Sequence, residues 1–441
     1  MKKLIYLCAL LLIAAACKKE KIESVFEQQP EERAGALLAE LESALLDAPY
    51  GWKASLNTVV GGGYGFYVQF NEDETLEMLS DFNESSRSEL KESTWRVKWG
   101  MAASLIFDTY NYIAMPQDPN PNVNGGAGGQ GLQSDVEFEY VRMNGDSVIL
   151  KGKRYKQKLV MVKLDQAAQE AYRSGEYATA VNAMQQFFAQ NVNNYIEIDG
   201  LEPKVEVKMN HSGKTFDFQY MDASDQVHSF TCKYNYDLGG INFNVPIEVE
   251  GTFFEKGLLK DGVLYLYDQD DKEYEVKQNP TPLSKLEILY SYNGAYSSIM
   301  ITGETLPAGV SSEFNQIFED MVARFRAAGG RYITSIAFTF QNATNFKVDL
   351  RYSNSAGTSY LADAVFDYTY ENGVLTLSNY TPSVTNGNWN TRVNELGEFV
   401  DWIQSGPFRV DWVTSSDPNV SGLGGLYRVD NPADFFYGTL E

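Results

Sequence analysis

Three dipeptides that favour tight hairpins constrain the fold of this chain most. Asn144-Gly145, Asp261-Gly262 and Asn372-Gly373 each stand between two strand-like runs rich in apolar residues. Asn-Gly and Asp-Gly tolerate the positive φ angles of two-residue turns, and alternating apolar residues place one face of a strand in a core. The pattern therefore predicts antiparallel sheets that curl toward sandwiches or barrels.

Amphipathic helices are expected between the runs of strands. Apolar residues recur at helical spacing in residues 31–47, 164–191, 311–328 and 391–404. Asp165 is a candidate N-cap, and Gly175 is expected to split the second segment into two helices. Strands that bunch in runs with helices between the runs indicate an α+β fold of mostly antiparallel modules.

Prolines and composition shifts suggest where the modules end. We expect a signal peptide at residues 1–16, a tether at 17–30, a helix and β-rich module at 31–192, a second β-rich module at 193–282, and a C-terminal α+β module at 283–441. The second module is able to form one domain with the first. Two prolines in Asn279–Pro282 indicate the boundary before the C-terminal module. Pro246 predicts that its strand lies at a sheet edge or that the proline stands at the start of the strand.

The first seventeen residues predict where the protein is located. Lys2 and Lys3 precede a short apolar run, and three alanines stand directly before Cys17. This pattern is typical of a bacterial lipoprotein signal, in which the cysteine is acylated and becomes the first residue after cleavage. Three acyl chains would hold the protein at a membrane, whereas one chain binds only marginally.

Charge and cysteine content exclude several classes of function. The 441-residue chain has a formal charge of −23, which disfavours contact with nucleic acid or with anionic lipid headgroups. Cys8 would leave with the signal and Cys17 would be lipidated. Cys232 would then be alone, so no intramolecular disulfide is expected and Cys232 is interpreted as a buried structural thiol.

Few residues offer catalytic chemistry. His211 and His228 are the only histidines, and neither a zinc motif nor a serine-hydrolase elbow is present. Asp108 and Glu137 flank an unusual loop, and paired carboxylates there could act as the acid and base of a glycosidase. The alternative interpretation is a solvated strand face, and the sequence as a whole favours a protein without enzymatic activity.

The unusual loop, residues 116–133, is a candidate calcium site. Asp118, Asn120 and Asn122 have the alternating spacing with which a calcium loop begins. Val123 occupies the position that requires glycine, and Gly129 replaces the bidentate glutamate. A long surface loop without metal is the alternative, so no cofactor is expected unless calcium binds here.

Three tryptophans are candidate ligand-binding residues. Trp389, Trp402 and Trp412 could stack on the faces of sugar rings. Aromatic residues at strand and helix spacing are more often part of a core, which is the competing interpretation.

Several stretches of the chain resemble a known family. They are Pro49–Trp52, the run Leu105–Ile113, the glycine-rich loop, Asp135–Tyr140 and Leu150–Arg154. Together they are similar to an uncharacterised domain-of-unknown-function family of lipoproteins in the Bacteroidota. The family's expected Gly-Gly-Asp is replaced here by Gln133-Ser134-Asp135. No catalytic residue is assigned in the family, so the resemblance implies none in this chain.

The resemblance implies a role in nutrient capture. Members of the family tend to be encoded beside outer-membrane transporters of the starch-utilisation type and their lipoprotein partners. We therefore expect a binding or accessory protein that is lipid-anchored at the outer membrane, in either leaflet. A carboxylate-based hydrolase and a structural or adhesive surface protein are the alternative hypotheses.

Overall fold

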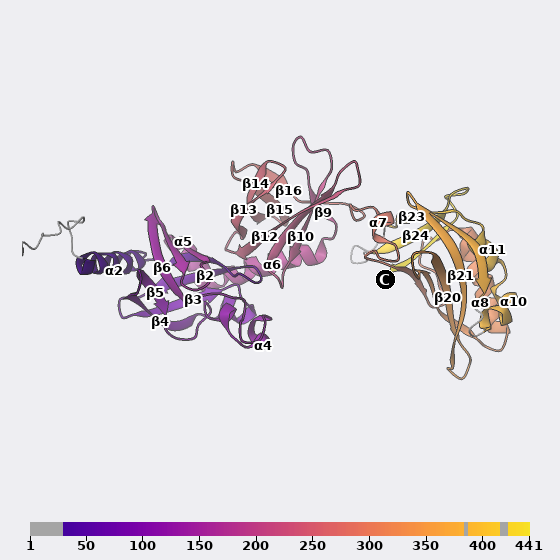
Figure 1. Ribbon diagram of the computed structural model, residues 1–441, viewed down its shortest axis with the longest axis horizontal. Coiled ribbons are helices and arrows are strands. Elements are labelled where there is room, and N and C mark those ends of the chain that lie inside the picture. Colours follow the sequence, from indigo (N-terminus) through magenta and orange to yellow (C-terminus); the bar gives the residue numbers. More distant parts are fainter. Residues whose placement is uncertain (1–29, 383–386, 415–421) are drawn as a thin grey trace, which may run out of the picture. The chain divides into compact units, whose positions relative to one another are not determined.

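The computed structural model describes residues 30–382, 387–414 and 422–441. In these residues antiparallel sheets dominate, and a few helices accompany them (Figure 1). The predicted α+β class with β-rich modules is therefore confirmed. Within the same residues, no helix combines the length and apolar character that a membrane crossing requires.

The chain divides into two compact units. The first unit comprises Met1–Ala54, Phe66–Ser80 and Glu89–Gln169, and the second comprises Ser55–Gly65, Asp81–Ser88 and Glu170–Glu441. Parts of the first sheet therefore belong to the second unit, although they are distant from it in the sequence. The Tyr177 hydroxyl, for example, donates to the carbonyl oxygen of Gly65 at 3.4 Å inside the second unit.

The first sheet is a closed antiparallel barrel of eight strands in sequence order. Its strands are β1 (Trp52–Asn57), β2 (Gly63–Phe70), β3 (Thr75–Ser80), β4 (Lys91–Trp99), β5 (Ala103–Phe107), β6 (Glu137–Asn144), β7 (Ser147–Gly152) and β8 (Lys158–Lys163). Large apolar side chains alternate along the strands and are buried, among them Phe66, Val68 and Phe70 on β2. Helix α2 (Pro30–Leu46) packs against β4 and β5. The Trp52 indole N–H donates to the Leu45 carbonyl at 3.0 Å and fixes the exit of this helix.

Helices lie between strands of this barrel and between its last strand and the middle sheet. They are α3 (Glu84–Ser88), the 3₁₀ turn η1 (Met115–Gln117), α4 (Pro121–Asn124), α5 (Gln166–Ser174) and α6 (Glu176–Gln190). Asp165 accepts the Ala168 backbone N–H at 2.8 Å, as its predicted capping role requires. Gly175, with a φ of 92°, separates α5 from α6 as the sequence predicts.

The middle sheet has nine strands in the order β16-β15-β14-β13-β12-β11-β10-β9-β17. They are β9 (Asn194–Ile196), β10 (Val205–Asn210), β11 (Thr215–Met221), β12 (Val227–Tyr236), β13 (Gly240–Val249), β14 (Thr252–Lys260), β15 (Val263–Asp268), β16 (Glu273–Glu275) and β17 (Lys277–Gln278). One face is lined by stacked and edge-on phenylalanines, including Phe216, Phe218 and Phe254. Phe188 of α6 packs edge-on against Phe216 and helps to cover this face.

The prediction for Pro246 is wrong. Pro246 lies in β13, which pairs with β12 on one side and β14 on the other. The register with β14 shifts between Asn242 and Ile247, so the ladder is interrupted at the proline. A proline has no backbone N–H to donate, and a bulge removes the need for that donor inside a sheet.

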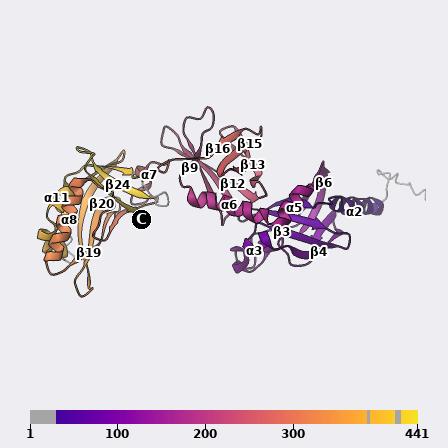
Figure 2. The same ribbon diagram turned by 180° about the vertical axis from the view of Figure 1, so that it is seen from behind.

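The C-terminal sheet is a second closed barrel. Its strands are β18 (Ser298–Thr302), β19 (Tyr332–Phe340), β20 (Asn345–Ser353), β21 (Ser359–Glu371), β22 (Val374–Pro382), β23 (Phe408–Trp412), β24 (Leu423–Arg428) and β25 (Phe435–Leu440), preceded by α7 (Leu286–Leu289). Helix α8 (Ser312–Ala327) lies beside this barrel together with α11 (Glu398–Gln404) (Figure 2). The α8 residues Phe314, Phe318, Met321 and Phe325 are buried in the core that the helices and strands share.

The helix predicted at residues 391–404 is three short helices instead of one. They are α9 (Asn388–Thr391), α10 (Val393–Leu396) and α11. Gly397, with a φ of 51° and a ψ of −132°, separates the last two because this backbone conformation lies outside the helical region. The predicted helix at 311–328 is confirmed by α8, whose N-cap Ser311 accepts the Phe314 N–H at 3.1 Å.

The three predicted hairpins are present. Lys260 pairs with Val263 across Asp261-Gly262, and Glu371 pairs with Val374 across Asn372-Gly373, with positive φ at all four turn residues. In the first hairpin Asn144 pairs with Ser147, so the turn residues are Gly145 and Asp146, one position later than the dipeptide suggests. The glycine still supplies the positive φ that the turn requires.

Replacing Phe314 by alanine should destabilise the C-terminal barrel by about 3–5 kcal/mol, because it leaves a cavity in a filled aromatic core. Phe314 is fully buried and contacts the rings of Trp402 and Phe436. Urea denaturation followed by tryptophan fluorescence measures the loss. The control is Val393→Ala at a side chain that is 53% exposed, which should change the free energy of unfolding by less than about 0.5 kcal/mol. Equal effects of the two substitutions would contradict the assigned core.

Candidate functional site

A polar groove on the first barrel is the strongest candidate for a binding site. It lies within the first unit, along β3 and β4 and the segments that follow β2 and β5, and has a volume of about 520 Å³. Ligand pockets in proteins commonly have volumes of about 300–1,000 Å³. The groove is lined by Asn71, Asp73, Thr75, Leu76, Glu77, Glu92, Ser93, Thr94 and Thr109.

A chain of hydroxyl groups forms one wall of the groove. The Ser93 and Thr109 hydroxyls are 2.6 Å apart, and the Asn111 amide donates to the Ser93 oxygen at 2.9 Å. The Thr109 hydroxyl oxygen also accepts the Thr94 backbone N–H at 3.2 Å. These bonds orient the hydroxyls, so this wall offers fixed polar groups at the surface of the barrel.

Carboxylates also line the groove. Asp73 accepts hydrogen bonds from the backbone N–H and the hydroxyl of Thr75, which hold the pKa of its carboxyl below the ordinary value. Glu77 of β3 is directly opposite Glu92 of β4 in the strand register. Like charges in this position disfavour strand pairing, and both carboxylates can accept hydrogen bonds from a ligand.

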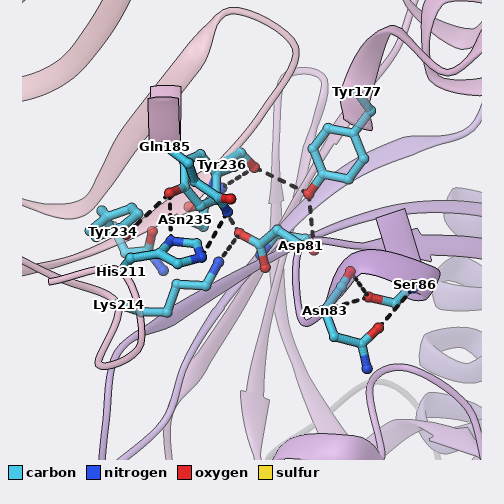
Figure 3. A network of polar contacts seen from close by, with 12 residues as sticks. Asp81, Asn83, Ser86, Tyr177, Gln185, His211, Lys214, Tyr234, Asn235 and Tyr236 are labelled. Carbon is cyan, nitrogen blue, oxygen red and sulfur yellow. Dashed lines mark hydrogen bonds and ion pairs between the residues drawn. The ribbon is translucent and has the colours of Figure 1, made fainter. Parts of the chain in front are cut away.

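The first barrel also supplies Asp81, the centre of a buried polar network in the second unit (Figure 3). Its carboxylate accepts the Gly65 N–H at 3.0 Å and the Tyr236 N–H at 2.8 Å. The Lys214 ammonium lies 2.8 Å from the same carboxylate, and both side chains are almost fully buried. Asp81, which directly follows β3, therefore connects the start of β2 to β12 and to the hairpin between β10 and β11.

Aromatic rings surround the Lys214 ammonium. The centroids of Tyr236, Tyr64 and Tyr234 lie 4.5, 5.6 and 5.8 Å from its nitrogen. Burial lowers the pKa of Lys214, and the Asp81 carboxylate opposes that shift. The rings and the carboxylate together replace part of the hydration that the buried ammonium has lost.

His211 closes the network at its solvent side. Its Nδ1 is 3.0 Å from the Tyr236 hydroxyl, and its Nε2 accepts from the Gln185 amide nitrogen at 2.7 Å. Burial and the nearby charges of Lys214 and Arg87 lower the pKa of His211. Both ring nitrogens thus have protein partners, and the arrangement orders the second unit without leaving a nucleophile and a base open to a substrate.

The predicted tryptophans are not brought together as a stacking platform. Trp389 and Trp402 are buried in the core of the C-terminal barrel, and their indole N–H groups donate to Tyr380 and to Asp434. Neither ring offers a face to solvent, because burial of these large apolar surfaces stabilises the barrel. Trp412 is only partly buried, and its N–H donates to the Ser284 carbonyl at 2.7 Å.

The candidate calcium residues form turns and a helix cap. One Asp118 oxygen accepts the Asn120 N–H at 2.8 Å, and the other accepts the Tyr110 hydroxyl at 2.5 Å. The Asn120 side chain caps α4 by accepting the Asn122 N–H at 3.1 Å. Among the described residues, no three or more His, Cys, Asp or Glu side chains are grouped to hold a metal ion. Calcium binding here stays a prediction, and it would require these oxygens to exchange protein donors for the metal.

The carboxylates proposed for a hydrolase are held in ion pairs. Asp108 pairs with Arg96 at 2.9 Å, and Glu137 pairs with Lys153 at 2.5 Å. Asp135, which precedes β6, is buried and accepts the backbone N–H groups of Arg154 and Tyr155. These contacts give each carboxylate a structural role on the barrel surface.

Of the remaining candidate residues, two contribute to the fold and one lies outside the residues that the structure describes. Cys232 is buried, and burial raises the pKa of its thiol, which is a poor nucleophile in that state. His228 pairs with Asp222 at 2.9 Å and stacks on Tyr220. Cys17 and the tether up to residue 29 lie outside the described residues, so lipidation stays a prediction.

Sequence reasoning missed both the groove and the buried network. Alternating polar residues on β3 and β4 indicate outward faces, but only the register places Glu77 opposite Glu92. Asp81 and Lys214 are far apart in the sequence and carry no local motif. Lys214 has a φ of 54°, an unusual conformation for a non-glycine residue that is visible only in the structure.

Asp81→Ala should destabilise the protein by about 3–5 kcal/mol, because it leaves the Lys214 ammonium buried without its carboxylate. Lys214→Met should cost less, since Asp81 would keep its two backbone donors. Urea denaturation of both variants measures the difference. A loss for Lys214→Met as large as that for Asp81→Ala would show that the carboxylate is not the centre of the network. Glu197→Ala, which removes an exposed ion pair with Lys277, is the control and should have little effect.

Comparison with known proteins adds a family but no activity. No curated protein matches the chain. Similar solved structures include a protein of unknown function of the DUF3598 family from Nostoc punctiforme, with 9% identity, 73% of this chain and 96% of that chain covered, and a TM-score of 0.14. Transferrin binding protein B from Neisseria meningitidis is 10% identical, and the match covers 89% of this chain and 76% of that protein, with a TM-score of 0.12. P47 from Clostridium botulinum is 8% identical, and the match covers 85% of this chain and 83% of that protein, with a TM-score of 0.10.

At these TM-scores the structural likenesses carry no argument about this chain. The match to a family model is of a different kind, because it covers more than half of the sequence. The model described as Domain of unknown function (DUF4302) matches residues 22–258, and the protein belongs to that family.

Proposed function

We propose that this protein is a non-enzymatic binding or accessory component of nutrient capture at the bacterial outer membrane. In this proposal it is a Bacteroidota lipoprotein anchored through Cys17. It acts beside a transporter of the starch-utilisation type and that transporter's lipoprotein partner. The lipoprotein-type signal and the family resemblance support the location, and the polar groove supports the binding role.

The groove on β3 and β4 is the observation that carries the proposal. It combines hydroxyls of Ser93, Thr94 and Thr109 with the carboxylates of Glu77 and Glu92. Such a surface accepts and donates many hydrogen bonds, which suits a small, hydroxyl-rich ligand such as a segment of a glycan. Leu76 is the only apolar residue among those that line it, so the groove favours a polar ligand over an apolar one.

The chemistry of the groove favours binding over catalysis. None of its lining residues is a histidine or a cysteine, and the hydroxyls of Ser93, Thr94 and Thr109 are bonded to one another. The Thr75 hydroxyl donates to Asp73, whose carboxyl pKa is held below its ordinary value, so this carboxylate is a weak base. A nucleophilic hydroxyl needs an adjacent base to be activated. The groove can therefore hold a polar ligand, and we assign no catalytic mechanism to it.

Anchoring and partnership are tested together by affinity purification. The tagged native lipoprotein, extracted from its own outer membrane in mild detergent, should co-elute with a transporter in stoichiometric amount, identified by mass spectrometry. Cys17→Ser should move the protein from the membrane fraction to the soluble fraction, because the acyl chains that hold it cannot be attached. Retention of the variant in the membrane, or the absence of any co-eluting transporter, would contradict the proposed role.

The groove predicts a defined loss of ligand binding. Glu92→Ala should weaken binding of a responsive oligosaccharide by about tenfold or more, because a charged hydrogen-bond acceptor is removed. Isothermal titration calorimetry on a glycan panel measures this loss. Glu313→Ala on α8 is the matched control, since it removes the same charge from an exposed position outside the groove.

Three results of that panel would count against the groove. They are equal affinities of the two variants, no binding of any glycan by the parent protein, and hydrolysis of a bound glycan. The last result would also contradict the non-enzymatic assignment.

A further inference from the structure

The hairpin between β7 and β8 carries a concentration of positive charge on an acidic protein. Residues 151–158 read Lys-Gly-Lys-Arg-Tyr-Lys-Gln-Lys, and the chain as a whole has 36 basic and 59 acidic residues. Lys151, Lys153, Arg154, Lys156 and Lys158 are all exposed. We call these five side chains the basic hairpin, and it belongs entirely to the first unit.

The basic hairpin is only partly neutralised. Lys153 pairs with Glu137 at 2.5 Å and Lys156 pairs with Glu139 at 3.5 Å. Lys151, Arg154 and Lys158 have no carboxylate partner among the residues that the structure describes. The Arg154 guanidinium instead lies over the Tyr155 ring, 4.8 Å from its centroid.

Two of the unneutralised cations face each other. Lys151 of β7 is directly opposite Lys158 of β8 in the strand register. On its other side Lys151 lies opposite Glu139 of β6, which offsets part of this repulsion. Like charges at opposing positions still disfavour the pairing of β7 with β8. An anion bound between the two lysines would convert the repulsion into attraction.

Hydrogen bonds to the buried Asp135 side chain fix the backbone of the basic hairpin. The buried Asp135 carboxylate accepts the N–H groups of Arg154 and Tyr155 at 2.8 and 2.9 Å. A Cβ atom at Gly152 would lie 2.2 Å from an Asp135 oxygen, so only glycine allows this close approach. The cations therefore project from a rigid support, which reduces the entropy lost when a partner binds.

We propose that the basic hairpin is a docking site for a carboxylate-rich segment of a partner protein. The hairpin is eight residues long and the rest of the chain is acidic, which favours a partner segment that contacts the hairpin alone. A broad polyanion would meet repulsion from the surrounding negative charge. Four of the five cations are lysines, and each compact ammonium group can pair with one carboxylate of an extended acidic segment.

Fluorescence anisotropy of a labelled decaglutamate peptide tests the proposal on the full-length chain in mild detergent. The parent protein should bind the peptide at low salt and release it at high salt, because exposed charges are screened. The triple variant Lys151→Gln, Arg154→Gln, Lys158→Gln should bind about tenfold more weakly, since three exposed charge contacts are lost. Lys151→Arg with Lys158→Arg should retain binding, because both charges are kept.

The control variant removes the same charge elsewhere. It is the triple variant Lys256→Gln, Lys260→Gln, Lys272→Gln, in β14 and in the turn between β15 and β16, where each lysine has an acidic partner. This control should bind the peptide as the parent does. An equal loss in the control would assign binding to net charge, and no binding by the parent would overturn the proposal. Tighter binding of heparin than of the peptide would overturn it in favour of a sulfated glycan.

Discussion

Antiparallel pairing of strands around an apolar interior is the constraint on which each module of this protein depends. Both barrels are closed, so their strands pair on both sides and no strand edge is left open to pair with another chain. The nine-stranded middle sheet ends in β16 and β17, which are only three and two residues long. Large aromatic side chains fill the interiors, and helices such as α2 and α8 cover what the strands leave exposed.

Buried carboxylates connect distant segments of the chain in two of these interiors. Asp81 holds two backbone N–H groups and the Lys214 ammonium, and the ammonium is enclosed by tyrosine rings. Asp434 has a comparable place in the C-terminal barrel, where it accepts from Ser311 at 2.9 Å and from Trp402 at 2.8 Å. A buried carboxylate with several donors connects segments that are remote in sequence, so these two aspartates contribute to a unique arrangement of the chain.

The surface features with functional potential are set apart from these buried networks. The groove on β3 and β4 and the basic hairpin of β7 and β8 both belong to the first unit. Each contains a like-charge pair in direct register, Glu77 with Glu92 and Lys151 with Lys158. Like charges at opposing positions disfavour strand pairing, and the ligand and the partner proposed above would each bring groups of complementary chemistry to such a pair.

The sequence alone determined the fold class, the hairpins and the main helices, because they depend on local periodicity, turn residues and caps. It also supplied the lipoprotein-type pattern at Cys17 and the family resemblance. Only the tertiary structure decided that Pro246 occupies an interior bulge, that Trp389 and Trp402 are core residues, and that Glu77 is opposite Glu92. These outcomes depend on strand register and on burial by distant segments, which local sequence does not encode.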